Sequence, residues 1–467
     1  MKKTKIVGTI GPASIDYKVL KKLVQAGLNV VRINLSHAKL EDMNTIMQNV
    51  KRLREELNIP LPVMIDTRGP EIRVRTFAEG SVQIKKGQKF IFTGRNVIGD
   101  NTQVSLNAPS IVKCVSKGDK ILAVNGLITF DVVDVAGKDI ITKAKNSGVL
   151  SNRKSLSIPG VRYTTPYLNE ADKHDILWAI ENDVDFVAAS FVNSKEDVQA
   201  LRKFIKTNGG DMKIISKIES QIGVDNLDEI IEVSDALMVA RGDLGVEVPM
   251  AKLPEIQKTM IKKCVTKGKA VITATEMLES MIENKRPTRA EVSDIANAVY
   301  DGTSCVMLSG ETANGKYPEE AVKTMANVVE ETEKHLTNSY VIEDVKLHSI
   351  PDLISHCAHT AAESQDIKAI LAYTHSGATA GRISRFRPRV HIIGATPNEK
   401  VYRQLDMLWG VRPILTPVYK TTDEMFVIAN EIVKKNKFAS VGDEVLITCG
   451  NPLECHGTNL MKIVRVK

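Results

Sequence analysis

Short apolar runs alternate with amphipathic segments from the start of the chain. The apolar run at 5–10 ends at Gly11-Pro12, and residues 16–26 then repeat apolar side chains at helical intervals up to Gly27. A strand at 29–35, a helix at 40–57 and a strand at 62–66 are expected next. Because parallel strands need a crossover helix between them, this order predicts a parallel α/β fold.

The pattern changes between about Gly69 and Tyr167. This stretch holds short β-rich runs separated by turn residues, such as SVQI, KFIFTG and DIITKA. We expect a small all-β module, a lid inserted between one strand and its helix.

Alternation then resumes through about residue 336. The expected helices are 169–181, 194–207, 221–231, 254–267, 289–299 and 318–335. The strands between them are expected at 185–192, 213–218, 235–240, 270–275 and 305–309. Eight strands alternating with eight helices fit a (β/α)₈ TIM barrel, with a doubly wound open sheet as the alternative.

Polar residues collect where these strands end, which favours the barrel because its chemistry gathers at the carboxyl ends of the strands. The segments concerned are RINLSH (32–37), DTRGPEIR (66–73), Lys217 with Glu219, ARGDLG (240–245), TATEM (273–277) and LSGET (308–312).

Lys217 and Glu219 stand two apart at the end of the strand KIISKIES, so they lie on one face of it. A buried cation and anion are costly unless they pair, bind a metal or meet a charged substrate. A plain ion pair at the strand end remains an open alternative.

Glu219 and Asp243 offer hard carboxylate oxygens with no thiolate or imidazole beside them, which favours Mg²⁺ or Mn²⁺. Neutralisation of the two acids by Arg241 or Lys217 is the alternative. The turn at Gly242 leads into a short helix whose N–H groups could bind a carboxylate or phosphate.

Cations and oxygen donors complete the expected rim. Arg32, Arg73, Lys154 and Lys217 would hold anionic oxygens during phosphoryl transfer. Asn34, Ser36, Asp66 and Thr67 would suit a large monovalent cation, although a local hydrogen-bond network also explains them. The sequence has no Walker A motif and no kinase glycine-rich loop.

Residues from about 337 onward repeat the alternation as a separate α/β domain. Two small, hydroxyl-rich loops, 374–379 (THSGAT) and 449–459 (CGNPLECHGTN), have the composition of a phosphate site or of plain connections.

Composition narrows the class of protein. The net charge of +7 arises from 63 basic and 56 acidic residues spread along the chain, and aromatic residues make up 4%; neither favours a nucleic-acid binder. The start lacks the apolar stretch of a signal peptide, and no apolar run is long enough to span a membrane, so a cytoplasmic protein is expected. The six cysteines match no zinc spacing and are expected to be reduced.

Eight motifs, in order and spacing, resemble the pyruvate kinase family. They are KTKIVGTIGPAS, VVRINLSH, IDTRGPEIR, IISKIES, VARGDLGVE, ITATEMLESM, RPTRAEVSDIANAV and VMLSGETANGKYP. The resemblance implies transfer of a phosphoryl group from phosphoenolpyruvate to ADP, the final step of glycolysis. It also implies three domains: a barrel at 1–69 and 168–336, a lid at 70–167 and a regulatory α/β domain at 337–467.

The resemblance also assigns roles to single residues. Lys217 and Arg32 would grip the phosphoryl group, Gly242, Asp243 and Thr275 would receive the substrate carboxylate, and Thr275 and Ser309 would lie near the carbon that is protonated. Glu219 and Asp243 would hold Mg²⁺ or Mn²⁺, and Asn34, Ser36, Asp66 and Thr67 would hold K⁺. Thr9, Pro12, His37, Arg73 and Lys154 would face the nucleotide.

Regulation is implied as well. A phosphorylated effector would bind at Thr374, Ser376, Gly377, Thr379, Gly457 and Thr458 in a homotetramer. Glu71 implies K⁺ dependence, because relatives with Lys at this position carry their own charge and resemble K⁺-independent enzymes. The rivals are a dikinase or aldolase using the same substrate, and a sensor without activity.

Overall fold

A closed barrel of eight parallel strands forms the centre of the molecule in the computed structural model, which describes residues 2–162, 166–336, 347, 349–451 and 457–467. The barrel strands are β1 (Lys5–Thr9), β2 (Val30–Asn34), β3 (Val63–Asp66), β13 (Phe186–Ala189), β14 (Lys213–Ile218), β15 (Ala236–Ala240), β16 (Ala270–Ala274) and β17 (Cys305–Leu308). Pairing of β1 with both β2 and β17 closes the ring. The expected barrel is therefore confirmed, and the open-sheet alternative is wrong.

Helices cover the outside of the barrel. They are α1 (Tyr17–Ala26), α2 (Leu40–Leu57), α3 (Glu170–Glu181), α4 (Lys195–Thr207), α5 (Gln221–Asp225), α6 (Leu227–Val233), α7 (Arg241–Glu247), α8 (Leu253–Thr266), α9 (Arg289–Tyr300), α10 (Gly310–Ala313) and α11 (Pro318–Lys334). Helix α1 begins where the Asp16 side chain accepts N–H groups of its first turn and ends at Gly27 with φ of 119°.

Strict one-to-one alternation is wrong in three places. The helix expected at 221–231 is two helices, α5 and α6, which meet at Asn226. The short helices α7 and α10 follow directly after β15 and β17, ahead of the longer helices α8 and α11. Both lie at carboxyl ends of strands, where they carry rim residues.

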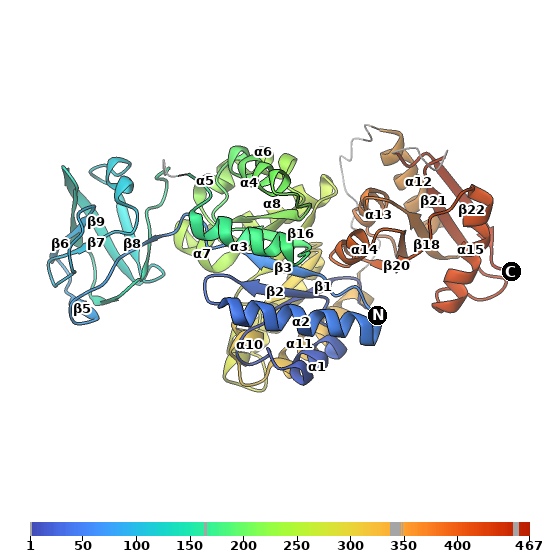
Figure 1. The fold of residues 1–467 in the computed structure, drawn as a ribbon, viewed down its shortest axis with the longest axis horizontal. Helices are drawn as coiled ribbons and strands as arrows, with labels where there is room; N and C mark the ends of the chain where they lie inside the picture. The colour runs from blue at the N-terminus through green and yellow to red at the C-terminus, as the bar shows by residue number, and fades with distance from the viewer. Residues whose placement is uncertain (1, 163–165, 337–346, 348, 452–456) are drawn as a thin grey trace.

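The lid sheet lies beyond one end of the barrel (Figure 1). Its strands are β4 (Ile72–Arg73), β6 (Lys89–Thr93), β7 (Gln103–Ser105), β8 (Lys120–Ala123), β9 (Ile128–Ala136), β10 (Asp139–Ala144) and β12 (Ser155–Ser157), and β5 (Ser81–Ile84) pairs with β11 (Gly148–Ser151). A bridge between Val74 and Leu106 links the two ends of the seven-stranded sheet. Phe90, Phe92 and Phe130 pack together in its core, with ring centroids 5.1–5.9 Å apart.

The carboxyl-terminal sheet lies at the opposite end of the barrel (Figure 1). Its order is β20 (Val411–Leu415), β19 (His391–Thr396), β18 (Ile367–Tyr373), β21 (Glu444–Cys449) and β22 (Leu460–Arg465), parallel except for β22. The helices α12 (Ile350–Ser364), α13 (Ala378–Ser384), α14 (Glu399–Leu405) and α15 (Thr422–Lys435) accompany it. The predicted separate α/β domain is confirmed.

Apolar packing and ion pairs join this domain to the amino ends of the barrel strands. Met407 is buried in the core inside the barrel, among Val7, Ile215 and Ile272. Lys5 at the start of β1 donates to Asp406 and to the Val411 carbonyl, each at 2.7 Å. The lid and the carboxyl-terminal domain therefore occupy opposite ends of the barrel, with the polar rim on the side of the lid.

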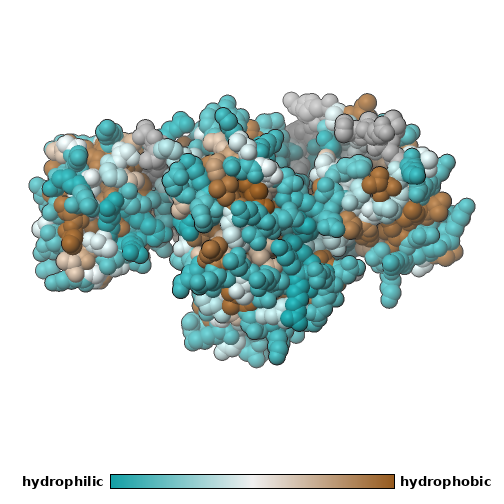
Figure 2. Space-filling model, viewed as in Figure 1, coloured by the Kyte–Doolittle hydropathy of each residue, from teal (hydrophilic) through white to brown (hydrophobic). Residues whose placement is uncertain are grey.

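Hydrophilic residues cover most of the face seen in Figure 2. Within the described ranges, the structure contains no helix whose length and apolar character would let it cross a bilayer. The five cysteines in these ranges are free thiols, and Cys455 lies outside them.

Candidate active site

A buried ion cluster lies where β2, β3 and β14 end. Asp66, the last residue of β3, accepts from Arg32 Nε at 2.7 Å and from Lys217 Nζ at 2.9 Å. All three side chains are at most 10% exposed. The barrel thus brings Arg32 of β2 and Lys217 of β14 together around the carboxylate of Asp66.

Lys217 has a second acidic partner in Glu219, with Nζ and Oε1 2.9 Å apart. The prediction that these two side chains share a face is confirmed. Lys217 Nζ also donates to Ser190 Oγ at 2.7 Å, and the Phe191 N–H donates to Glu219 Oε2 at 2.7 Å. The pair is therefore part of a network that is wider than an isolated ion pair at the strand end.

Charge balance in the cluster sets the protonation of its members. Burial opposes the charge of Lys217, but Asp66 and Glu219 outweigh it and raise the lysine pKa. Burial also pushes the Asp66 pKa upward, yet the charges of Arg32 and Lys217 hold it below its ordinary value. Lys217 and Asp66 are consequently charged at neutral pH.

Glu219 behaves differently. Burial raises its pKa to about 7, and the nearby charge of Asp243 acts in the same direction against the charge of Lys217. A buried carboxylate whose ionisation is disfavoured by a second carboxylate nearby is an arrangement that a divalent cation relieves.

Asp243 lies in the first turn of α7 and is exposed to solvent. The described contacts include no ion pair to it. Arg241 instead holds Asp294 through Nη1, at 2.7 and 2.8 Å to its two oxygens. Of the two proposed neutralising groups, only Lys217 takes that role, and only toward Glu219.

No group of three or more His, Cys, Asp or Glu side chains suited to a metal occurs in the described ranges. The two carboxylates Glu219 and Asp243 fit a hard cation that draws its remaining oxygens from water and substrate, since Mg²⁺ is commonly held by one or two carboxylates in this way.

Thr275 follows β16 in a left-handed backbone conformation, with φ of 67°. This conformation is unfavourable for a β-branched residue and persists only where neighbours hold it. Arg241 donates to the Thr275 carbonyl, and Thr275 Oγ1 accepts the Gly242 N–H at 2.9 Å. These contacts hold the strained backbone and fix the threonine hydroxyl against the start of α7.

Ser309 follows β17, and its N–H donates to Glu311 Oε2 at 2.7 Å. Its hydroxyl oxygen is buried and has no hydrogen-bond partner in the described part of the chain. An unpaired buried hydroxyl is costly, so a partner from a bound molecule is expected.

The oxygen donors of the predicted monovalent-cation site lie at the ends of β2 and β3. Asn34 and Asp66 are register partners. Asn34 Oδ1 accepts the Ser36 N–H at 3.1 Å, and Thr67 Oγ1 accepts the Ser190 N–H at 3.1 Å. These bonds form the local network named as the alternative, and the oxygen-rich donor set also fits K⁺.

Four of the five predicted nucleotide residues divide into an exposed group and a buried one. Pro12, His37 and Lys154 are exposed. Thr9 is buried, and its hydroxyl accepts from Arg32 Nη1 at 2.7 Å and donates to the Leu308 carbonyl at 3.0 Å. Its contact with a nucleotide stays a prediction.

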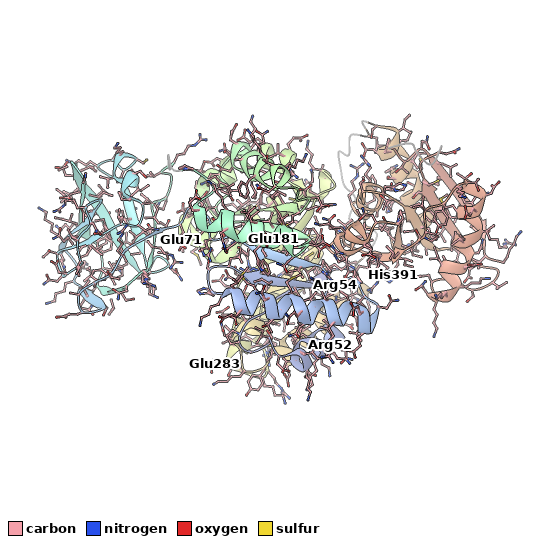
Figure 3. The ribbon with its side chains drawn as sticks, in the orientation of Figure 1. Arg52, Arg54, Glu71, Glu181, Glu283 and His391 are labelled. Atoms are coloured by element: carbon pink, nitrogen blue, oxygen red, sulfur yellow. The ribbon has the colours of Figure 1, made fainter. Side chains whose placement is uncertain are left out.

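Arg73 pairs with Glu71, with Nη2 and Oε2 2.6 Å apart. Figure 3 places Glu71 where the lid sheet meets the barrel. Burial raises the pKa of Glu71, partly offset by Arg73, and Asp243 adds to the rise. Glu71 therefore lies close to the charges of Asp243 and Lys217, which also act on Glu219.

The predicted effector loops line one cavity of about 730 Å³ in the carboxyl-terminal domain. Thr374, Ser376, Thr379, Gly457 and Thr458 line it, together with Arg382. Gly377 precedes α13 with φ of 87°, and its N–H donates to Thr374 Oγ1 at 2.9 Å. Thr379 and Thr458 hydroxyls lie 2.7 Å apart, so the two loops meet; residues 452–456 of the second loop lie outside the described ranges.

Sequence reasoning missed Ser190 and the pairing of Arg241 with Asp294. Ser190 follows β13, the strand between β3 and β14. A hydroxyl residue at the carboxyl end of that strand was the one sequence feature that could have marked Ser190 as part of the site. Asp294 lies on α9, and no local pattern connects it with Arg241.

Comparisons with known proteins agree along the whole chain. Residues 1–322 match the family model described as pyruvate kinase, barrel domain, and residues 352–464 match pyruvate kinase, alpha/beta domain. The chain is 42% identical over 469 residues to a pyruvate kinase of Clostridium acetobutylicum, covering 99% of both chains. It is 43% identical over 469 residues to that of Geobacillus stearothermophilus, covering 99% of this chain and 80% of the relative. A solved pyruvate kinase structure from Cryptosporidium parvum superposes with a TM-score of 0.95 at 36% identity, covering 100% of this chain and 96% of the other.

Proposed function

The chain belongs to the pyruvate kinase family, and from this premise we propose that the cluster around Lys217 is where the phosphoryl group leaves phosphoenolpyruvate. The reaction transfers that group to ADP and gives pyruvate and ATP, the final step of glycolysis. The observation that carries the assignment is the sharing of Asp66 by Arg32 and Lys217 at the carboxyl rim of the barrel.

In this proposal Lys217 and Arg32 hold the oxygens of the transferring phosphoryl group. Phosphoryl transfer spreads negative charge over those oxygens, and fixed cations in a water-poor site stabilise it without reorganisation. Asp66 keeps both cations in place, because its two oxygens bind one each.

The substrate carboxylate would meet the N–H groups of Gly242 and Asp243 and the hydroxyl of Thr275, and it would replace the hydrogen bond that the Gly242 N–H donates to Thr275 Oγ1. The strained backbone of Thr275 supports this role, since it fixes the hydroxyl at the start of α7. Enolpyruvate takes up a proton at its terminal carbon to become pyruvate. Thr275 Oγ1 would pass that proton, and the Ser309 hydroxyl, which is buried without a partner in the described ranges, would lie beside the same carbon.

Glu219 and Asp243 would hold Mg²⁺ or Mn²⁺, and Asn34, Ser36, Asp66 and Thr67 would hold K⁺. When bound, these cations supply positive charge to carboxylate and phosphoryl oxygens. Glu219 must be ionised to serve as a ligand; its pairing with Lys217 at 2.9 Å favours the ionised form, whereas burial raises its pKa to about 7.

Thr9, Pro12, His37, Arg73 and Lys154 would face the nucleotide, and the Thr9 hydroxyl also accepts a hydrogen bond from Arg32. Lys154 directly precedes β12 of the lid sheet. We therefore assign residues 70–167 as a lid over the barrel of 1–69 and 168–336, and residues 337–467 as the regulatory domain.

The test is a lactate-dehydrogenase-coupled assay with and without ADP. Pyruvate formation from phosphoenolpyruvate that depends on ADP supports the assignment, whereas formation without ADP would indicate another enzyme using this substrate. Absence of turnover in both would indicate a sensor.

A regulatory role for the cavity between the two effector loops is a further part of the proposal. Arg382 and the hydroxyls of Thr374, Ser376, Thr379 and Thr458 line it, which suits a phosphorylated effector. A homotetramer in the cytoplasm would transmit its binding. Fructose 1,6-bisphosphate, ribose 5-phosphate and AMP are the effectors to screen, and an unmoved phosphoenolpyruvate saturation curve would exclude all three.

A further inference from the structure

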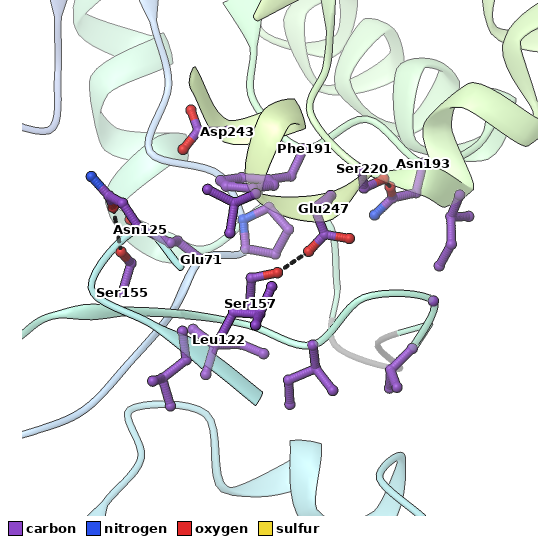
Figure 4. Close-up of a pocket in the computed structure, with 18 residues that line it drawn as sticks. Glu71, Leu122, Asn125, Ser155, Ser157, Phe191, Asn193, Ser220, Asp243 and Glu247 are labelled. Atoms are coloured by element: carbon purple, nitrogen blue, oxygen red, sulfur yellow. Dashed lines mark hydrogen bonds between the residues drawn. The ribbon is translucent and has the colours of Figure 1, made fainter. Parts of the chain in front are cut away.

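A hydrogen bond joins the lid to the barrel at a place distant along the chain from the lid's first connection near residue 70. The Ser157 hydroxyl, at the end of β12, donates to Glu247 Oε1, at the end of α7 (Figure 4). The two residues are 90 positions apart in the sequence.

Ser157 is fixed to the body of the lid. Its neighbours Leu156 and Ile158 are buried in the lid core at 5% and 2% exposure. Side chains alternate along a strand, so Ser157 points out of that core toward the barrel. Movement of the lid therefore moves this hydroxyl with it.

Glu247 is fixed to the barrel in the same way. Leu244 and Val248 on either side of it are buried at 0% and 4% exposure. Arg241, at the start of the same helix, is held by Asp294 and by the Thr275 carbonyl. The acceptor thus belongs to the seven-residue helix that also carries Gly242 and Asp243.

The surroundings of the pair are those of a contact between two bodies. Both residues line a narrow cleft between lid and barrel, shared with Glu71 and Asp243. The lid also approaches α7 at Gly126, because a Cβ added there would lie 3.5 Å from Val246 Cγ1. Burial raises the pKa of Glu247, opposed by the hydrogen bond from Ser157.

We propose that Ser157 and Glu247 are a positioning pair that sets the angle of the lid, and with it the nucleotide-facing Lys154, relative to the α7 helix that carries Asp243. Lys154 lies three positions before Ser157, so the hydrogen bond acts close to the lysine. A lid connected to the barrel only by its chain crossings would sample many orientations, and nucleotide binding would have to select among them. The inference rests on the proposed roles of Lys154 and of the lid.

The expected effect of Ser157→Ala is a rise of about tenfold in KM for ADP, the size expected from one hydrogen bond to a charged acceptor. KM for phosphoenolpyruvate should change less than twofold, because its proposed contacts lie on the barrel. Ser157→Thr keeps a hydroxyl and should restore most of the affinity for ADP.

Ser155→Ala is the matched control. Ser155 lies on the same strand, but its hydroxyl donates to Asn125 within the lid, at 3.4 Å. This variant removes a serine hydroxyl from the lid without touching the barrel contact, so both KM values should stay within twofold of the parent.

A double-mutant cycle with Glu247→Ala tests the pairing itself. The double variant should be no worse than the poorer single variant, and Glu247→Gln, which keeps an acceptor oxygen, should be milder than Glu247→Ala. If Glu247→Ala does not fold, the comparison of Ser157→Ala with Ser155→Ala and Ser157→Thr decides alone.

The idea is overturned if Ser157→Ala matches Ser155→Ala, if it raises both KM values equally, or if the cycle is additive. Lys154→Ala separates this failure from failure of the proposed function. If Lys154→Ala weakens ADP while Ser157→Ala does not, the positioning pair falls and the nucleotide role of the lid stands. If Ser157→Ala weakens ADP binding while Lys154→Ala does not, the pair still sets the angle of the lid, but its effect does not act through Lys154, and the lysine assignment falls.

Discussion

Replacement of Lys217 by methionine tests the centre of the proposed site. Methionine keeps a similar length but removes the ammonium group that contacts Asp66, Glu219 and Ser190 at 2.7–2.9 Å. Loss of one fixed donor to developing charge costs about 3–4 kcal/mol of transition-state stabilisation. We therefore expect kcat to fall by a factor of about 10²–10³.

The same change also affects folding stability, and its sign can be worked out from the contacts. Asp66 keeps Arg32 as a partner, whereas Glu219 keeps only the Phe191 N–H among its described contacts. Loss of one partner from a buried ion pair costs about 3–5 kcal/mol. The pKa of Glu219, already raised to about 7, should rise further without Lys217, so protonation at low pH relieves the cost. The deficit in thermal midpoint should shrink as pH falls from about 8 to 6, since a carboxyl with a raised folded pKa destabilises the fold most above that pKa, and this penalty declines steadily as pH drops toward the ordinary carboxyl pKa.

The assay is steady-state turnover with saturating phosphoenolpyruvate and ADP, beside thermal denaturation at each pH. Lys213→Met is the matched control, because Lys213 begins the same strand β14 at its other end. Because Lys213 lies at the end of β14 away from the rim, its removal should leave kcat unchanged. Burial lowers the pKa of Lys213, so its charge is disfavoured in the folded state and its removal should cost little stability. A Lys217→Met variant that folds and keeps more than a tenth of the parent kcat would show that the assignment is wrong.

Three further predictions concern the cations and the lid. A proton competes with the metal for Glu219, whose pKa is raised to about 7, so the affinity for Mn²⁺ measured by titration calorimetry should weaken as pH falls from 8 to 6. Glu219→Gln should weaken binding and remove this pH dependence, and Asp243→Ala should also weaken binding. Equal affinity of the parent at both pH values would contradict the ligand role of Glu219. Lys154→Ala should raise KM for ADP more than KM for phosphoenolpyruvate, and equal changes would indicate a static lid. Glu71→Lys should retain activity in a Na⁺ buffer in which the parent is inactive, at some loss of maximal rate, because an ammonium group replaces the charge of K⁺. Full activity of the parent without K⁺ or NH₄⁺ would refute this explanation of Glu71.

Local patterns of apolar and polar residues predict much of the architecture. Apolar periodicity located the barrel strands to within a few residues, and the helix expected at 40–57 has those bounds in the structure. The two-residue spacing of Lys217 and Glu219 was enough to place them on one face, because side chains alternate along any strand. The resemblance to the family then followed from eight motifs in its order and spacing.

Local patterns could not supply the partners that barrel closure creates. Asp66 lies 151 positions from Lys217 and meets it only because β3 and β14 flank the same strand, β13. The left-handed backbone of Thr275 is held by Arg241, which comes from the neighbouring strand end. Residue type and spacing carry no information about such strain, because it depends on the neighbours that enforce it.

The sequence by itself thus determined the elements, their order and the residue types at each strand end, because these follow from short-range periodicity and composition. Only the tertiary structure decided which cations pair with which carboxylate, that Arg241 pairs with Asp294 and not with Asp243, and that Ser157 donates to Glu247 across the cleft. Such contacts depend on the closure of the ring and the angle of the lid. Both are set by the packing of segments far apart in the chain, which no local pattern of hydrophobic and polar residues records.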